Sequence, residues 1–220
     1  MKMAPDVLEQ TERTRLRRLR EKGSYERDTI NAVLDAMPLA HIGYVMNGTP
    51  SVLPTLQWRE GDHVYWHGSS ASRALRAMKG QQVCMTVSIL DGFVLARSAL
   101  HHSVNQRSVM IFGEAEQITD TDAKNAHMKA MFDHMFPGRW DTLRPMQVQE
   151  SKATAVFRMP LTEASAKLRD AQPADDEADY ALPIWAGVVP VSLQLGAPVS
   201  DPRNLAQVAP PSHLGHIRIG

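Results

Sequence analysis

The dipeptide Asn47-Gly48 constrains the fold more strongly than any other feature of this sequence. Asparagine and glycine tolerate the positive φ angles of the two-residue turns that join antiparallel strands. Strand-like stretches lie on both sides of the dipeptide, at residues 41–46 and 51–58, and a second turn leads into residues 63–66. The pattern therefore predicts three antiparallel strands connected as a meander.

The rest of the chain is predicted from the same kind of periodicity. Helices are expected at residues 6–22, in the stretch that ends at Pro38, and at residues 70–79 and 120–136. Strands are expected at residues 82–89, 93–96, 109–116, 153–159 and 183–195, with a turn at Asp91-Gly92 and a loop with some helix at residues 163–179. Because strands and helices do not alternate regularly, the chain is predicted to be mainly β with peripheral helices (α+β), in a closed or split barrel.

The composition excludes several classes of protein. Lys+Arg and Asp+Glu both number 24 in 220 residues, so the basic excess of a dedicated nucleic-acid-binding protein is missing. No apolar run reaches the roughly 18–20 residues that span a bilayer. A single cysteine, Cys84, cannot form an internal disulfide and fits a reducing compartment. A cytoplasmic protein that binds neither nucleic acid nor membrane is expected.

The stretch His67-Gly68-Ser69-x-x-Ser72-Arg73 is the first candidate site. It leads from a strand into a helix, and it gathers backbone N–H groups, hydroxyls and a guanidinium where the positive end of the helix dipole lies. Such a turn can bind a phosphate. The alternative is that Ser69 or Ser70 is an ordinary helix N-cap.

A second candidate consists of Arg97-Ser98 and Arg107-Ser108, which bracket His101, His102 and Asn105. These side chains could hold a phosphate and the edge of a heteroaromatic ring, or they could form a polar loop with internal ion pairs. Pro54, in the second strand of the meander, cannot donate to a ladder, so it marks an edge or a bulge, where a neighbouring N–H can face a ligand.

A metal site is not expected. Nine histidines are present, but His127 and His134 stand seven residues apart without acidic partners, and His101 and His102 would point to opposite faces of a strand. Cys84 lies in a strand pattern and is interpreted as buried filler.

Several ordered stretches together resemble the pyridoxamine 5'-phosphate oxidase-like flavin-nucleotide-binding proteins of the split-barrel type. The resemblance covers roughly residues 12–200. Gln106 departs from it, because this branch usually has a tyrosine before Arg-Ser. The stretches are residues 64–69, 84–87, 91–98, 105–109, 137–140 and 185–188.

The resemblance implies a six-stranded antiparallel split β-barrel that forms a homodimer, with FMN in clefts at the subunit interface. Residues 1–22 would be a polar N-terminal arm, residues 23–200 the FMN-binding domain and residues 201–220 a flexible tail. The implied cofactor-binding residues form three groups. The first is the candidate turn, the second lies beside Pro54, and the third completes the site from the same chain or from the partner chain. They are Pro54, Thr55, Leu56, His67, Gly68, Ser69, Ser72, Arg73, Arg107, Ser108 and Trp185.

The function implied is that of an FMN-dependent oxidoreductase acting on a small organic substrate. The alternative is a non-catalytic protein that binds flavin, deazaflavin or haem on the same barrel, with His101 or His102 as an axial ligand of a haem iron. His67 and His102 are candidates for a general acid or base, although both also fit structural roles. The basic residues of the tail, such as His213 and Arg218, do not match the substrate-phosphate site of the vitamin B6 oxidase.

Overall fold

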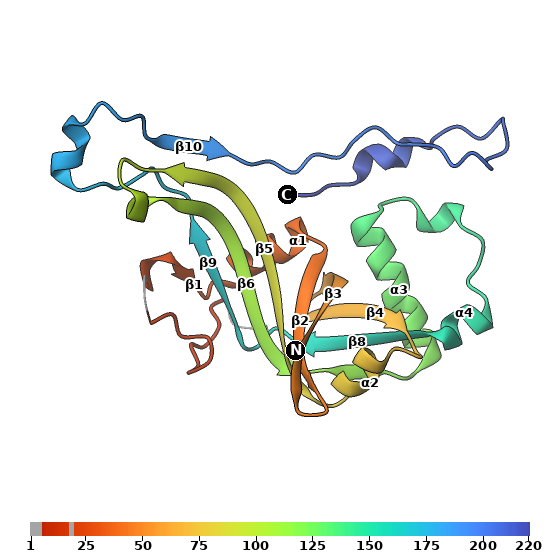
Figure 1. Ribbon diagram of the computed structural model, residues 1–220. Coiled ribbons are helices and arrows are strands. Elements are labelled where there is room, and N and C mark those ends of the chain that lie inside the picture. The colour runs from red at the N-terminus through yellow and green to blue at the C-terminus, as the bar shows by residue number, and fades with distance from the viewer. Residues whose placement is uncertain (1–5, 18–19) are drawn as a thin grey trace.

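The computed structural model describes residues 6–17 and 20–220 and has one antiparallel sheet with helices around it (Figure 1). The order along the sheet is β1-β9-β6-β5-β2-β3-β4-β8-β7, and β10 pairs with β5 outside this path. The strands are β1 (Gly23–Ser24), β2 (Leu39–Met46), β3 (Thr49–Glu60), β4 (His63–Ser69), β5 (Gln82–Leu95), β6 (Ser103–Glu114), β7 (Glu116–Ile118), β8 (Thr154–Pro160), β9 (Ala164–Arg169) and β10 (Gly187–Pro190).

Four α-helices and five short 3₁₀ helices accompany the strands in the described part of the chain. The α-helices are α1 (Arg27–Ala36), α2 (Arg73–Met78), α3 (Thr121–Met135) and α4 (Val148–Ala153). The 3₁₀ helices are η1 (Arg20–Lys22), η2 (Ala99–His101), η3 (Trp140–Thr142), η4 (Glu177–Ala181) and η5 (Ser212–His216).

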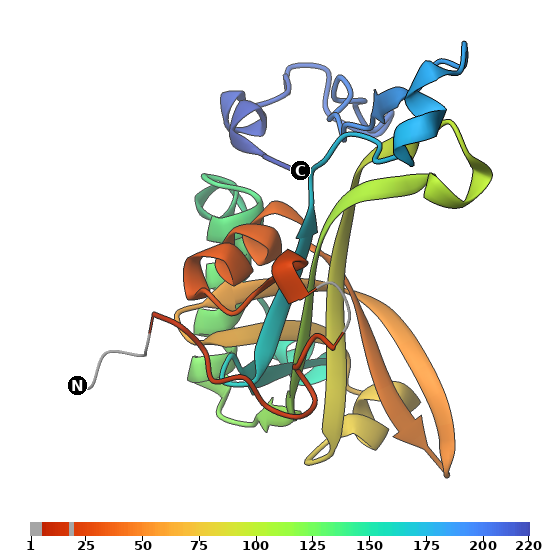
Figure 2. The same ribbon diagram turned by 90° about the vertical axis from the view of Figure 1, so that its left-hand side faces the viewer.

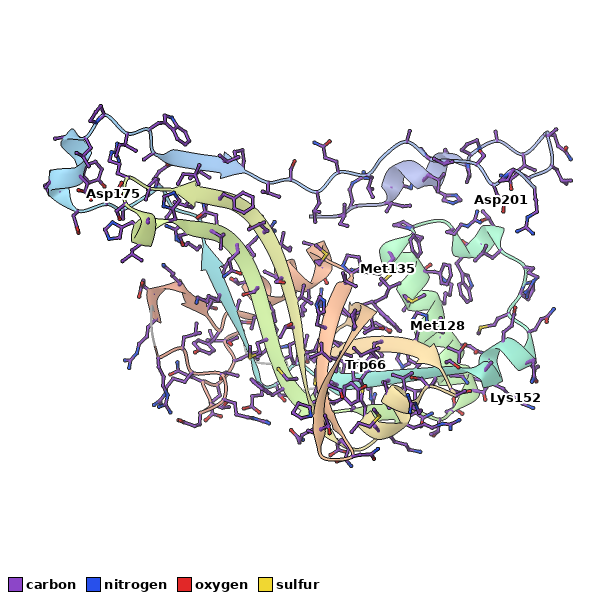
Figure 3. The ribbon with its side chains drawn as sticks, in the orientation of Figure 1. Trp66, Met128, Met135, Lys152, Asp175 and Asp201 are labelled. Carbon is purple, nitrogen blue, oxygen red and sulfur yellow. The ribbon has the colours of Figure 1, made fainter. Side chains whose placement is uncertain are left out.

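The main hydrophobic core lies inside the curve of the sheet (Figure 2). Helix α1 packs against β3, β5, β6 and β9, and α2 packs against β2. Trp66 is at the centre of this core and stacks on Phe157, with 5.7 Å between the ring centroids (Figure 3). Burial of these large apolar side chains is the main force that holds the curved sheet against the core.

A second core lies on the other face of β3, β4 and β8, under α3. Successive side chains of a strand point to opposite faces, so Tyr65 faces away from Trp66 and stacks on Trp58. Helix α3 covers this pair with Met128, Met131 and Met135, two of which are labelled in Figure 3.

The predicted mainly β fold with peripheral helices is confirmed, as are the β2-β3-β4 meander and the helices that became α1, α2 and α3. Asn47 and Gly48 have φ angles of 53° and 77°, as the predicted turn requires. Over residues 6–17 and 20–220 the sheet has ten strands and is not closed along its hydrogen-bonded path, so the implied six-stranded barrel is not confirmed. The division into arm, domain and tail stays a prediction.

The predicted helix over residues 6–22 is wrong. Val7 forms an isolated bridge with Glu26, and the Leu8 N–H donates to the Tyr25 carbonyl, with 2.9 Å between nitrogen and oxygen. The Leu8 side chain enters the main core, so a long-range contact overrides the weak helix preference of the segment. Arg13 pairs with Glu163 of its own chain; of the other arginines in the segment, Arg18 lies outside the described residues.

Three other predictions for single segments are wrong in part. Strand β5 runs through Asp91-Gly92 with a bulge instead of turning there. Gly92 lets β10 lie close to β5 at this point, since a Cβ on Gly92 would lie 3.1 Å from the Val189 carbonyl oxygen. Part of the expected loop at residues 163–179 is strand β9, whose small side chains gave little strand signal. The last strand, β10, is limited to Gly187–Pro190.

The chain after β10 runs across the molecule to the end of α3 and then folds back (Figure 1). The Gly220 N–H donates to the Ala36 carbonyl at 2.8 Å, so the last residue is joined to the end of α1. Among the helices that the structure describes, none is both long enough and apolar enough to cross a bilayer.

Candidate functional site

The turn between β4 and α2 has the predicted form of a strand, a glycine and a serine-capped helix. Ser72 is the N-cap, since its Oγ accepts from the Leu75 N–H at 3.4 Å. Ser69 Oγ accepts from the Ala71 N–H at 3.2 Å, so neither Ser69 nor Ser70 caps the helix. The Ser70 N–H donates to the Ala153 carbonyl at 2.8 Å, which fixes the turn against the end of α4, just before β8.

Gly68 brings α2 close to β4. A Cβ at this position would lie 2.9 Å from Leu75 Cδ1, and Leu75 is buried in the main core. The glycine therefore allows close packing between the helix and the end of the strand.

Arg73, the first residue of α2, is exposed and has neither a hydrogen bond nor an ion pair within the described residues. A cation in the first turn of a helix is unfavourable unless an anion accompanies it. Arg76 lies one turn further along and donates from Nε to the Ser70 carbonyl at 3.2 Å. Two guanidinium groups on one exposed helix beside the serine turn make this surface suited to an anion.

The strands β3 and β4 part next to this turn. Residues Gln57–Glu60 of β3 pair with β4, whereas Thr49–Leu56 pair with β2, and no described strand pairs with the second edge of that part. The predicted residues Pro54, Thr55 and Leu56 lie on this open edge. The β2–β3 register is continuous there, so Pro54 marks an edge and not a bulge. An open edge offers backbone N–H and C=O groups to a ligand.

Gln57 holds the point where the strands part. Its buried Nε2 donates to the carbonyls of Leu34 and Met37, at 2.7 and 2.9 Å. These carbonyls belong to the last turn of α1 and to its C-cap, where backbone acceptors lack partners within the helix. The open edge is therefore fixed to the rest of the molecule.

His67 is the first residue of β4 beyond its pairing with β3 and is still paired with β8. It is half-buried, with its ring centroid 6.0 Å from that of Trp58. Its Nδ1 is buried without a hydrogen-bond partner among the described residues. Burial lowers the pKa of His67, so the ring is neutral near neutral pH.

Arg107 and Ser108 lie elsewhere, in the middle of β6. Arg107 forms two hydrogen bonds with Asp91, from Nε to Oδ2 at 3.0 Å and from Nη2 to Oδ1 at 2.8 Å. Asp91 raises the pKa of Arg107 through these bonds. Ser108 Oγ donates to the Lys167 carbonyl at 3.4 Å. Both side chains are thus engaged within the sheet.

Trp185 is 67% exposed and stands just before β10, which lies at the opposite end of the molecule from α2 (Figure 1). One chain therefore brings together the predicted residues of the β4–α2 turn and the open edge of β3. It does not bring Trp185 to them, and it holds Arg107 in an ion pair.

The predicted second site around His101 and His102 forms the tip of the β5–β6 hairpin, where Figure 3 labels Asp175. The buried Asp175 carboxylate accepts from the backbone N–H and from Nη1 of Arg97, at 2.9 and 3.0 Å. His101 Nδ1 lies 3.6 Å from Asp175 Oδ1, and His102 Nδ1 lies 2.9 Å from the Ser98 carbonyl oxygen. These contacts agree with the second of the two interpretations of this stretch, a polar loop with internal ion pairs.

A possible metal-ligand set also occurs at this tip, where none was expected. His101, Asp175 and Asp179 each offer one ligand atom, and these atoms lie within 4.8 Å of one another. The charge of Asp175 is already balanced by Arg97. Asn105, predicted to face a ring, instead joins the chain to the segment after β9, since its Nδ2 donates to the Ala171 carbonyl at 3.2 Å.

Two cavities on either side of Phe132 were missed by the sequence analysis. One, of about 500 Å³, lies between α3 and the tail and includes His213 and Arg139. The other, of about 710 Å³, lies between α3 and the segment that contains Trp140 and Arg144. The stretch at residues 137–140 was a signal for this region, but nothing local indicated that the tail returns to it.

Comparison with known proteins identifies the family. A family model described as pyridoxamine 5'-phosphate oxidase matches residues 26–168. No curated protein matches the sequence significantly.

Solved structures give closer relatives. The flavocytochrome Anf3 from Azotobacter vinelandii is 48% identical, with a TM-score of 0.92 over 96% of this chain and 98% of the other. The FAD and heme binding protein from Mycobacterium smegmatis is 36% identical, with a TM-score of 0.86 over 90% of this chain and 97% of the other.

A structure from Bacteroides thetaiotaomicron shares the fold at 19% identity. It is described as that of a candidate 5-nitroimidazole antibiotic resistance protein. Its TM-score is 0.55, over 66% of this chain and 85% of the other. Together, the family model and the two closer relatives show that this chain belongs to the pyridoxamine 5'-phosphate oxidase family.

Proposed function

We propose that this protein is a flavoprotein that binds a flavin nucleotide between the β4–α2 turn and the open edge of β3. The observation that carries the proposal is Arg73 in the first turn of α2, whose guanidinium has no partner within the described residues, beside the serine turn and the parting strands. Ser69, Ser72 and Arg73 would hold the phosphate. His67 and Gly68 would shape the turn, and the backbone of Pro54, Thr55 and Leu56 would face the flavin ring.

The flavin, when bound, supplies the electron transfer, and the chain supplies binding and orientation. An oxidoreductase acting on a small organic substrate is the activity that we propose. Support comes from the relation to the flavocytochrome at 48% identity. A protein that only binds the flavin is the alternative, and it would show no turnover with NADH, NADPH or chemical reductants in the presence of electron acceptors.

We propose a flavin nucleotide as the class of cofactor, and FMN as the particular nucleotide. A flavin agrees with the family and with both closer relatives, one of which is described as binding FAD. The sequence resemblance implied FMN, whose single phosphate the β4–α2 turn could hold alone. Denaturing the purified protein and identifying the released nucleotide by chromatography decides between FMN and FAD.

We propose haem as a second cofactor, because the two closer relatives are described as a flavocytochrome and as an FAD and heme binding protein. The predicted axial ligands His101 and His102 differ in their surroundings. The Nδ1 of His102 lies beside the Ser98 carbonyl, which leaves Nε2 free, whereas His101 faces Asp175. A carbonyl or carboxylate beside Nδ1 is the usual orienting group of a metal-bound imidazole.

We propose a homodimer with the cofactor clefts at the subunit interface. Large apolar side chains are exposed in succession before, within and after β10, a pattern that marks surfaces covered by a partner. The partner chain would also bring Trp185 and its neighbours toward the cofactor. The exposed side chains are Trp185, Val189, Leu193, Leu195 and Val199.

An absorption spectrum of the purified full-length protein tests the two cofactors together. A flavin band and a Soret band support the proposal, and a colourless protein that takes up neither cofactor contradicts it. Arg73→Ala should weaken flavin affinity by ~1–3 kcal/mol, as expected for a lost charge-assisted contact. Arg17→Ala, an exposed arginine that pairs with Glu12, is the control. Equal affinities in the two variants would show that Arg73 does not touch the phosphate.

A further inference from the structure

The cavity of about 500 Å³ between α3 and the tail is built from two distant parts of the chain. Phe132 and Phe136 come from the end of α3 and its C-cap, whereas Leu214 and Ile217 come from the tail. Its volume lies in the range of sites for small molecules and cofactors. Figure 3 labels Asp201, which lines the cavity where the tail passes the loop after α3.

Among the described residues that line this cavity, His213 is the one with an imidazole. Its Nε2 is buried and has no hydrogen-bond partner among the described residues. Burial of a ring nitrogen without a partner is unfavourable, so the position suits a ligand that binds nitrogen.

The loop after α3 seats the His213 side chain. Gly138 has a φ of +82°, and a Cβ on it would lie 3.2 Å from His213 Cβ. A side chain at position 138 would therefore be strained and would crowd the histidine. Arg139, the next residue, brings a guanidinium to the cavity wall.

We propose that this cavity holds the haem, with His213 Nε2 as an axial ligand of the iron and Arg139 beside a propionate. This inference rests on the haem part of the proposed function. Haem is a flat, largely apolar porphyrin ring with two propionate carboxylates and an iron that accepts histidine. Aromatic and aliphatic walls, a guanidinium and an unpartnered imidazole nitrogen match these three features, and arginine is well suited to carboxylates.

The alternative ligands His101 and His102 lack such surroundings. Neither lines any of the cavities described above. Their loop lies at the tip of the β5–β6 hairpin, and its neighbour Leu100 is 94% exposed. His213 is therefore the better placed of the three for a haem that one chain encloses.

The test is a comparison of His213→Ala with His216→Ala in the full-length protein loaded with haem. His216 belongs to the same short helix η5, is exposed and does not line the cavity, so it is a matched control. Haem content, the Soret spectrum and the electron paramagnetic resonance signal of the iron are measured, with flavin content from the same sample.

We expect His213→Ala to lower haem affinity at least tenfold and to change the spectrum, and imidazole added to the solution to restore it. His216→Ala should match the wild type. His213→Cys should keep haem with the spectrum of a thiolate ligand, which guards against a variant that merely fails to fold. Arg139→Gln should weaken haem binding and leave flavin content unchanged.

A wild-type spectrum in His213→Ala, together with loss of the Soret band in His101→Ala or His102→Ala, would overturn the assignment and leave haem binding itself intact. A wild-type protein that binds flavin but takes up no haem would instead remove the haem part of the proposed function, and this inference with it.

Discussion

Arg107 and Asp91 join β6 to β5 through two hydrogen bonds between a guanidinium and a carboxylate. Asp91 lies at the bulge of β5, where the β5–β6 register shifts between Leu90 and Gly92. The pair therefore stands where the sheet ladder is interrupted, and it holds the two strands together there.

A double-mutant cycle measures this relationship. Both side chains are about one third exposed, so Arg107→Ala and Asp91→Ala should each lower the free energy of unfolding by about 1 kcal/mol. The double variant should lose little more than either single variant, because the same pair is removed. Urea unfolding of the four proteins gives the coupling energy. Two results together would identify Arg107 as a cofactor contact instead. The losses in the free energy of unfolding would be strictly additive, and, of the two single variants, only Arg107→Ala would lose flavin affinity.

Gly68→Ala should lower the free energy of unfolding by about 1–2 kcal/mol, because the new methyl group would push Leu75 out of its place in the core. Leu75 belongs to α2, so its displacement should also shift this helix and weaken flavin binding. Gly43→Ala is the control in a neighbouring part of the sheet, since its Cβ would meet only the Cys84 carbonyl oxygen at an ordinary 3.6 Å. Thermal unfolding and flavin titration check both variants, and equal behaviour of the two would refute the packing role of Gly68.

His67 should make stability depend on pH. Burial lowers its pKa in the folded protein, so between that value and the unfolded pKa of about 6.5 the unfolded chain binds more protons. The contribution of neutral His67 is complete above about pH 6.5 and is lost as the pH falls toward the folded pKa. His67→Asn should therefore flatten the pH dependence of the free energy of unfolding.

Urea unfolding between pH 5 and pH 8 checks this prediction. Burial also lowers the pKa of His63, which lies on the same face of β4, so part of the slope should remain in His67→Asn and disappear when His63→Asn is added. An unchanged slope in the double variant would assign the pH dependence to other groups.

The proposed dimer predicts a change of size when its apolar surface is made polar. Leu195→Asp and Val189→Asp introduce charges where side chains are exposed in a single chain, so neither should disturb the fold of that chain. In a dimer, each should weaken association by several-fold or more. Light scattering of the variants checks this, with Leu205→Asp as an exposed control further along the tail. A wild-type protein that is monomeric at all concentrations contradicts the proposal.

The parts of the fold that the sequence predicted are those with local causes. Asn47-Gly48 specifies its turn through φ angles, and the Ile30, Val33 and Leu34 spacing specifies α1 through one buried stripe. The β4–α2 turn was likewise identified from adjacent residues, although its cap is Ser72.

The parts that the sequence missed depend on distant contacts. Residues 6–17 follow the placement of Leu8 in the core, and Gly92 bends β5 because β10 approaches from nearly a hundred residues away. His213 joins Phe132 only after the tail has crossed the molecule. None of these contacts leaves a period or a motif in the sequence.

The open edge of β3 has a consequence for what isotope labelling can detect. A strand paired on one side has alternate amide hydrogens that face away from its neighbour, and in β3 these belong to the segment Thr49–Leu56. In D₂O such hydrogens are replaced quickly unless something covers them, whereas those bonded to β2 are replaced slowly. Pro50 and Pro54 have no amide hydrogen, so the amides that face outward here are those of Val52 and Leu56. A molecule seated against this edge would slow the exchange of these two amides and leave those bonded to β2 as they were.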